Sequence, residues 1–152
     1  SIPRYMSEGA LQRLEATTIH PGFVQAVKDA LSQFWGGPKL SQSPLLAMRI
    51  VRDKLREYDG VTAKAMRAVL QEAVERLKPE GERSMTASEW TVYNILELKF
   101  IQGQRIRDIA HRLAMSESDF YRKQRIAIEQ VAETLAQMER ATVQRSSPDK
   151  RT

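Results

Sequence analysis

Apolar residues recur at helical spacing along almost the whole chain, and no convincing stretch alternates with the period of two that a half-buried strand shows. The pattern therefore predicts an all-α protein. Most of the expected helices carry their apolar residues on one face, which would pack against a shared core. The predicted helices cover residues 7–17, 21–34, 44–58, 62–77, 86–102, 106–113 and 116–140.

Helix boundaries in the first half are marked by residues that interrupt a helix or favour its first turn. The run WGGP, residues 35–38, ends the helix that begins at Pro21. Ser43 can cap the next helix and Pro44 fits its first position. A single helix is therefore expected from Pro44 to the Asp-Gly pair at residues 59–60.

The segment KPEGERSM, residues 78–85, combines proline, glycine and four charged residues, and it is the best candidate for a linker. We expect a domain boundary there. The predicted domains are an amino-terminal helical bundle over residues 1–82 and a second domain over 83–140. Residues 141–152 lack apolar periodicity and are expected to form a disordered tail or a linker.

Three helices are expected after the linker, and the last two are separated by about three residues. Thr86 and Glu89 have the spacing of a capping box for the first, which ends near Gly103. So short a connection makes the last two helices cross sharply, and Ala110 lets them approach closely. Ser116 is placed to cap the last helix. This is a helix-turn-helix pattern, with apolar positions at Ile106, Ile109, Leu113, Met115, Phe120, Ala127 and Ile128.

The segment ILELKFIQGQRIRDIAHRLAMSESDFYRKQRIAIEQV resembles the helix-turn-helix of region 4 of bacterial sigma factors and of related response-regulator output domains. In those families a helix of the form LLELRY.EG precedes the pattern EIA..LG.S...V.....A...L. The likeness covers residues 88–136. It implies a sigma-region-4-like fold with an extended last helix, whose amino end enters the major groove of double-stranded DNA.

The whole chain resembles the amino-terminal regions of large transcriptional regulators of filamentous and soil bacteria. The likeness lies in the runs FVQAVKDALSQF, SQSPLL, AVLQEAVERLKP and SESDFYRKQRIAIEQVAETLAQME. In several of those regulators an ATPase module and helical repeats follow. Together with a first residue that is Ser1 rather than methionine, this implies that the chain is a fragment of a larger regulator.

Four residues depart from the helix-turn-helix pattern. Ala114 stands where glycine is usual in the turn, and alanine costs up to ~1 kcal/mol there if the turn requires a positive φ. Glu117 and Asp119 favour the dipole of the last helix but repel phosphate, although a carboxylate can read a cytosine amino group. Gln124 occupies a position that is usually apolar, where it would loosen the core.

Composition limits the classes of protein that remain. The chain has no cysteine, which excludes disulfide scaffolds and thiolate zinc sites and suits a reducing cytoplasm. His20 and His111 are far apart in sequence, so a metal centre is not expected. No apolar run approaches the ~20 residues of a membrane span, so we expect a cytoplasmic protein without a membrane partner. The net charge of +5 permits a polyanionic partner without requiring one.

Catalytic motifs are missing from the sequence. It contains no glycine-rich phosphate loop, no nucleophile motif and no histidine-carboxylate cluster. Glu80 and Glu82 are paired acids, but they lie in the predicted linker, where nothing would hold them in catalytic geometry. We therefore expect neither an enzyme nor a bound cofactor.

The predicted function is sequence-specific binding of double-stranded DNA in bacterial transcriptional regulation. Six basic and three acidic residues lie between positions 105 and 125. The candidate contacts to bases or sugars are Glu117, Ser118, Asp119, Tyr121, Arg122 and Arg125. The candidate contacts to phosphates are Arg105, Arg107, Arg112, Ser116 and Lys123.

A helical protein-interaction adaptor is the alternative. It would use a degenerate helix-turn-helix to dock on RNA polymerase, on another regulator or on the protein's own missing domains. Exposure of Phe120 and Tyr121 as an apolar pair would suit such a partner, whereas a polar, basic face suits DNA. Farther along, the last helix carries an apolar stripe that either packs on residues 21–78 or forms the seam of a homodimer. The stripe consists of Val131, Ala132, Leu135 and Met138.

Overall fold

The computed structural model describes residues 20–145, and within this range the protein is all-helical, as predicted. The helix predicted over residues 7–17 lies outside the described residues. The first half contains α2 (Pro21–Ser32), α3 (Pro38–Ser41), the 3-10 helix η2 (Pro44–Ala47), α4 (Arg49–Glu57) and α5 (Thr62–Arg76). The second half contains the 3-10 helix η3 (Ser88–Trp90), α6 (Thr91–Leu96), the π-helix η4 (Glu97–Ile101), α7 (Ile106–Arg112) and α8 (Glu117–Arg145).

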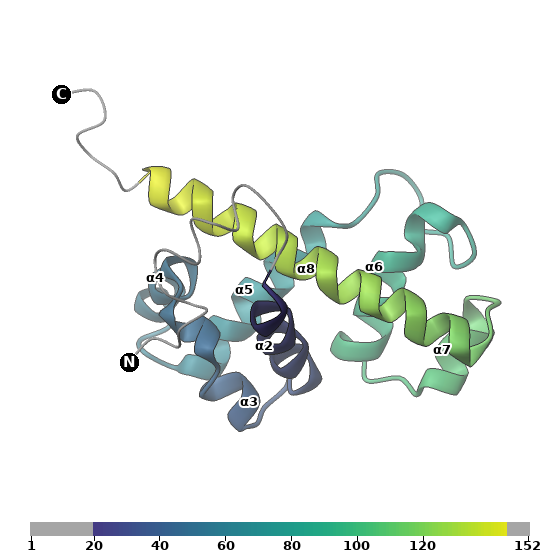
Figure 1. The fold of residues 1–152 in the computed structure, drawn as a ribbon, viewed down its shortest axis with the longest axis horizontal. Helices are drawn as coiled ribbons and strands as arrows, with labels where there is room; N and C mark the ends of the chain where they lie inside the picture. The colour runs from purple at the N-terminus through teal and green to yellow at the C-terminus, as the bar shows by residue number, and fades with distance from the viewer. Residues whose placement is uncertain (1–19, 146–152) are drawn as a thin grey trace.

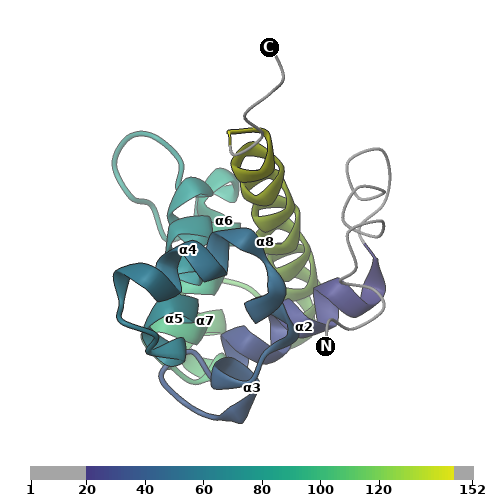
Figure 2. The ribbon, with the colours of Figure 1, turned by 90° about the vertical axis from the view of Figure 1, so that its left-hand side faces the viewer.

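Helix α8 runs along the whole length of the described molecule (Figure 1). It has 29 residues, which corresponds to about 43 Å. Its amino-terminal turns lie against α7 and α6, and its later turns lie against α2, α5 and α4. Figure 2, turned by 90°, shows α8 beside the group of shorter helices from the first half. A single helix therefore connects the two halves of the molecule.

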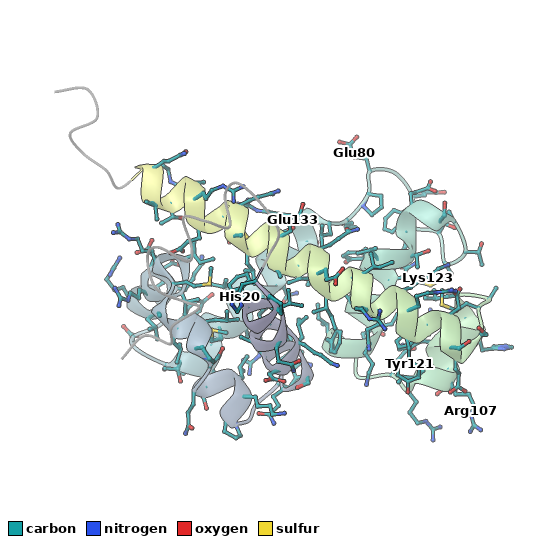
Figure 3. The ribbon with its side chains drawn as sticks, in the orientation of Figure 1. His20, Glu80, Arg107, Tyr121, Lys123 and Glu133 are labelled. Atoms are coloured by element: carbon teal, nitrogen blue, oxygen red, sulfur yellow. The ribbon has the colours of Figure 1, made fainter. Side chains whose placement is uncertain are left out.

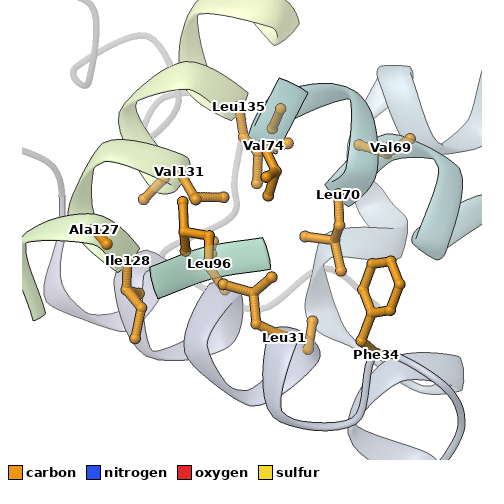
Figure 4. Packing of buried hydrophobic residues seen from close by; sticks show 14 of the residues in the cluster. Leu31, Phe34, Val69, Leu70, Val74, Leu96, Ala127, Ile128, Val131 and Leu135 are labelled. Atoms are coloured by element: carbon orange, nitrogen blue, oxygen red, sulfur yellow. The ribbon is translucent and has the colours of Figure 1, made fainter. Parts of the chain in front are cut away.

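One continuous cluster of buried apolar side chains includes residues from both halves. In Figure 4, Leu31 of α2 and Leu70 of α5 face Leu96 of α6 and the α8 residues Val131 and Leu135. Burial of each leucine contributes about 1.5–3 kcal/mol to stability. The apolar stripe of the last helix is thus packed on the amino-terminal bundle, and it is not exposed as a seam for a second copy.

The helix predicted from residue 44 to 58 is in fact two helices. Ser43 caps η2 with its side chain, as expected, but Met48 has an extended backbone (φ −72°, ψ 145°) that separates η2 from α4. The buried carboxylate of Glu139, on α8, accepts hydrogen bonds from the backbone N–H groups of Arg49 (3.0 Å) and Ile50 (3.1 Å). The amino terminus of α4 is therefore capped from another helix.

The predicted capping box at Thr86 and Glu89 is wrong. The residue before η3 is Ala87, and its side chain makes no capping hydrogen bond. The hydroxyl of Ser84 instead accepts from the backbone N–H groups of Thr86 (3.3 Å) and Ala87 (2.9 Å). The turn thus satisfies these donors with a serine that precedes the expected cap by two residues.

The segment predicted as a linker, residues 78–85, is tied to the helix that follows it. The side-chain amide of the buried Asn94 donates to the carbonyl of Ser84 at 2.8 Å and accepts from Arg83 Nε at 2.9 Å. Arg83 also forms a 2.8 Å ion pair with Glu97. These bonds hold the loop against α6 and η4.

The tail predicted from residue 141 is wrong as far as Arg145, because these residues continue α8. Thr142 is buried and its hydroxyl accepts a 3.0 Å hydrogen bond from Arg145. Ala141 and Thr142 line a pocket together with residues of α4 and α5. Residues 146–152 lie outside the described range. None of the helices between residues 20 and 145 is both long and apolar enough to cross a membrane.

Candidate nucleic-acid interface

Helices α7 and α8 are joined by the four residues 113–116, and backbone hydrogen bonds close the end of α7. The N–H of Ala114 donates to the carbonyl of His111 at 3.2 Å, and the N–H of Met115 donates to that of Ala110 at 2.9 Å. This pair of bonds is a Schellman motif. Its central residue, Ala114, has φ +58°, a conformation that glycine adopts at lower cost.

The first turn of α8 is organised by Ser116. Its hydroxyl accepts a 3.1 Å hydrogen bond from the N–H of Asp119, as the sequence predicts for a cap, and it lies 3.3 Å from the hydroxyl of Ser118. Phe120 is fully buried, whereas Tyr121 is 52% exposed. The two rings meet edge to face at 5.8 Å. The amino end of α8 is thus anchored on one side and open on the other.

The candidate contact residues gather at this end of the molecule. Figure 3 shows Tyr121 and Arg107 there, far from His20 and from Glu80. Within the first three turns of α8, Asp119 is half-buried. The remaining candidates for base or sugar contact are exposed, namely Glu117, Ser118, Tyr121, Arg122 and Arg125.

Asp119 pairs with two of the candidate cations. Its carboxylate binds the guanidinium of Arg122 and lies 3.2 Å from Lys123 Nζ. The hydrogen bond from Arg122, followed by that from Lys123, lowers the pKa of Asp119 below its ordinary value of 3.8. In the free protein, the negative charge of Asp119 therefore neutralises part of the positive charge of Arg122 and Lys123.

The other basic residues among the candidates differ in whether they pair with a neighbouring side chain. Arg105 lies 3.5 Å from Asp108, and Arg112 donates to the side-chain oxygen of Gln104 at 3.3 Å. Arg107 and Arg125 have no carboxylate partner among the described residues. Neither arginine has to break an ion pair with a described residue before it contacts another group.

A groove beside Tyr121 was not expected from the sequence. It has a volume of 740 Å³, and its walls come from the carboxyl end of α2, from η4 and from α8. Besides Tyr121 and Gln124, these walls carry Lys28, Trp35 and Lys99, which the sequence patterns did not single out. The only local signal was Trp35 itself, an aromatic residue placed directly before two glycines.

Comparison with protein-family models, with curated proteins and with solved structures finds no match to this chain. In the described range, no group of three or more histidine, aspartate or glutamate side chains is arranged to hold a metal ion. The geometry of α7, the turn and α8 is therefore the basis for assigning a function.

Proposed function

We propose that this chain binds double-stranded DNA through a helix-turn-helix formed by α7, residues 113–116 and the first turns of α8. In this proposal it acts in bacterial transcriptional regulation and reads sequence in the major groove. The observation that carries the proposal is that the first turns of α8 have one buried face and one exposed face. Phe120 is buried, while Tyr121, Arg122 and Arg125 lie on the open side.

The charge around this face supports DNA over a protein partner. Phe120 and Tyr121 are not exposed as an apolar pair, because Phe120 is inside the core. Residues 105–125 include six lysines and arginines and three aspartates and glutamates, which is an excess of three positive charges. Such an excess favours phosphate, and the salt dependence of binding would report the number of phosphates contacted.

Arg125 and Arg122 have different roles in this proposal. Arg125 is exposed and has no acidic partner in the described range, so it can contact a base or a phosphate directly. Arg122 first has to leave Asp119. An exposed ion pair is weak, whereas a bidentate contact from arginine to guanine is strong, so DNA can displace the carboxylate.

Selection of duplexes from a random pool, followed by titration of the enriched site at several salt concentrations, tests the proposal. We expect an enriched motif, with log affinity falling steeply as log salt rises. Arg122→Ala should cost about 1–3 kcal/mol on that motif and little on random DNA, if Arg122 reads guanine. Arg52→Ala, an exposed arginine on α4, is the matched control and should leave both affinities unchanged.

Two results would contradict the proposal. One is the absence of any enriched motif, with no binding near physiological salt. The other is an equal loss of affinity in the Arg52→Ala control and in Arg107→Ala and Arg125→Ala, since only the latter two lie at the α7–α8 end. The first result would favour the protein-interaction adaptor, and the second would indicate binding to DNA through general positive charge and not through the α7–α8 end.

A further inference from the structure

The groove between α2, η4 and α8 has the size of a small-molecule site. Its volume of 740 Å³ falls within the range of about 300–1,000 Å³ that is usual for such sites. Of the residues on its walls, only Tyr121 belongs to the proposed DNA contacts. The groove therefore has to be explained by its own chemistry.

Trp35 is an exposed aromatic side chain that is nevertheless held in place. The residue is 64% exposed, yet its Nε1 donates a 2.7 Å hydrogen bond to the carbonyl of Ile101. The guanidinium of Arg67 lies 5.0 Å from the ring centre, and Phe34 packs against the ring edge to face at 5.1 Å. A rigid, solvent-facing indole is a preorganised surface on which a planar ring can stack.

The charge of the groove favours an anion. Lys28 and Lys99 are both on its walls, and neither forms an ion pair with a described residue. The described residues of the walls include no aspartate or glutamate. An anionic group between these lysines would be attracted by both and would meet no acid on the described walls.

Two further features of the groove are unusual for a purely structural surface. Lys99 and Phe100 belong to the π-helix η4, and π-helical turns are rare and frequent at functional sites. Gln124 Oε1 is a buried oxygen with no hydrogen-bond partner among the described residues. Because Gln124 Oε1 has no partner there, turning this oxygen toward a ligand donor would break no hydrogen bond that it makes.

We propose that this groove binds a planar aromatic anion, that is, an aromatic ring carrying a phosphate or a carboxylate. The ring stacks between Trp35 and Tyr121, and the anionic group lies near Lys28 and Lys99. Gln124 accepts a hydrogen bond from a ring substituent. This site goes beyond the proposed DNA binding and does not depend on it.

The site is tested by titrating the full chain with 1-naphthyl phosphate and, separately, with 1-naphthoate. The NMR signal of the Trp35 indole N–H reports binding. We expect a saturable shift of that signal with one equivalent bound, while the buried Trp90 indole stays unchanged. The double variant Lys28→Gln/Lys99→Gln should weaken binding at least tenfold. The matched control, Arg52→Gln/Lys64→Gln, removes two exposed charges elsewhere and should bind as the wild type does. The probe that binds with the higher affinity would show whether the site prefers a phosphate or a carboxylate.

Three results would overturn the proposal: no saturable shift with either anion, equal binding of the uncharged 1-naphthalenemethanol, or equal weakening in both double variants. A shift of Trp35 with single-stranded oligonucleotides but not with small anions would also overturn it, since the groove would then extend a nucleic-acid surface. All four lysine and arginine positions are outside the buried core, so these variants should fold. Failure of the duplex selection would leave these outcomes unaffected.

Discussion

Ala114 adopts a left-handed backbone conformation, φ +58°, at the centre of the Schellman motif that ends α7. An alanine in this region is strained because its Cβ crowds the neighbouring carbonyl, whereas glycine has no Cβ. The strain lies in the turn that sets α7 against α8. A single residue therefore weakens the unit on which the proposed function depends.

Ala114→Gly should stabilise the protein by about 0.5–1 kcal/mol, because relief of the strain outweighs the greater entropy of glycine in the unfolded chain. Chemical denaturation followed by circular dichroism measures the effect. The matched control is Ala68→Gly within α5, which should destabilise by about 1 kcal/mol. Destabilisation by both substitutions would show that the turn tolerates alanine without strain.

The carboxyl of Asp119 provides a second test at single-residue resolution. Its pKa lies below 3.8 because Arg122 and Lys123 bind the charged form. The corresponding stabilisation is present above pH 3.8 and is lost as the pH falls through the lower, folded-state pKa. Arg122→Ala should raise this pKa toward 3.8, as measured by NMR titration of the carboxyl carbon. Arg125→Ala is the control, and an equal rise there would contradict the pairing.

Local features of the turn could be predicted from the sequence, and contacts between side chains could not. The cap at Ser116 depends only on residues within one turn, so the sequence predicted it correctly. The departures noted at Ala114 and Gln124 also coincide with a positive φ and a buried, unpartnered oxygen. The pairing of Asp119 with Arg122 requires particular rotamers, which residue spacing alone does not specify.

At the scale of the helices, α4 begins where it does because of a residue on α8. The Glu139 carboxylate satisfies two backbone donors at the start of α4 that would otherwise be unpaired. A carboxylate at this position also interacts favourably with the helix dipole. The contact links helices that are ninety residues apart in sequence.

Glu139→Ala should destabilise the protein by about 1–3 kcal/mol, because buried N–H groups of α4 would lose their acceptor. Thermal or denaturant unfolding measures this loss. Glu133→Ala, on the exposed side of the same helix, should change stability by no more than about 0.5 kcal/mol (Figure 3). Similar effects of both substitutions would rule out the capping role.

Helices with strong local signals were predicted well, and those shaped by distant contacts were not. The start of α2 at Pro21 and the span of α5 follow from local proline, glycine and apolar periodicity. The break at Met48 depends on Glu139, which no local pattern can indicate. Likewise, the π-helical turn of η4 looks like ordinary helix in sequence. Gly103, which was expected to stop the helix, has φ +69° and lies two residues after the end of η4 at Ile101.

At the scale of the whole molecule, buried side chains from both halves form one cluster around α8. The predicted candidate residues all lie between positions 105 and 125, so their proximity in space follows from the sequence. The groove is different, because it combines Trp35 with Tyr121, which only the packing of α2 near η4 and α8 brings to one surface. No pattern in the sequence indicates that Trp35 and Tyr121 lie on one surface.

The continuous core predicts that both halves unfold together. Trp35 and Trp90 are the two tryptophans of the chain and lie in different halves. Trp35→Phe leaves Trp90 as the reporter, and Trp90→Phe leaves Trp35. In each variant, tryptophan fluorescence and circular dichroism should give the same denaturation midpoint. A lower fluorescence midpoint in one variant would instead indicate two separately unfolding domains, divided near residues 78–85.

Because α8 is one long, uninterrupted helix, a small tilt at one end produces a larger displacement at the other. The amino-terminal bundle holds its later turns, while Tyr121, Arg122 and Arg125 sit near the opposite end. Over a helix of about 43 Å, a tilt of about 5° at the bundle displaces the far end by roughly 3–4 Å. That distance equals about one step between successive bases on a DNA strand, 3.4 Å. In the proposed DNA complex, a tilt of this size that α6, α7 and α8 make together would shift the exposed side chains by about one base step.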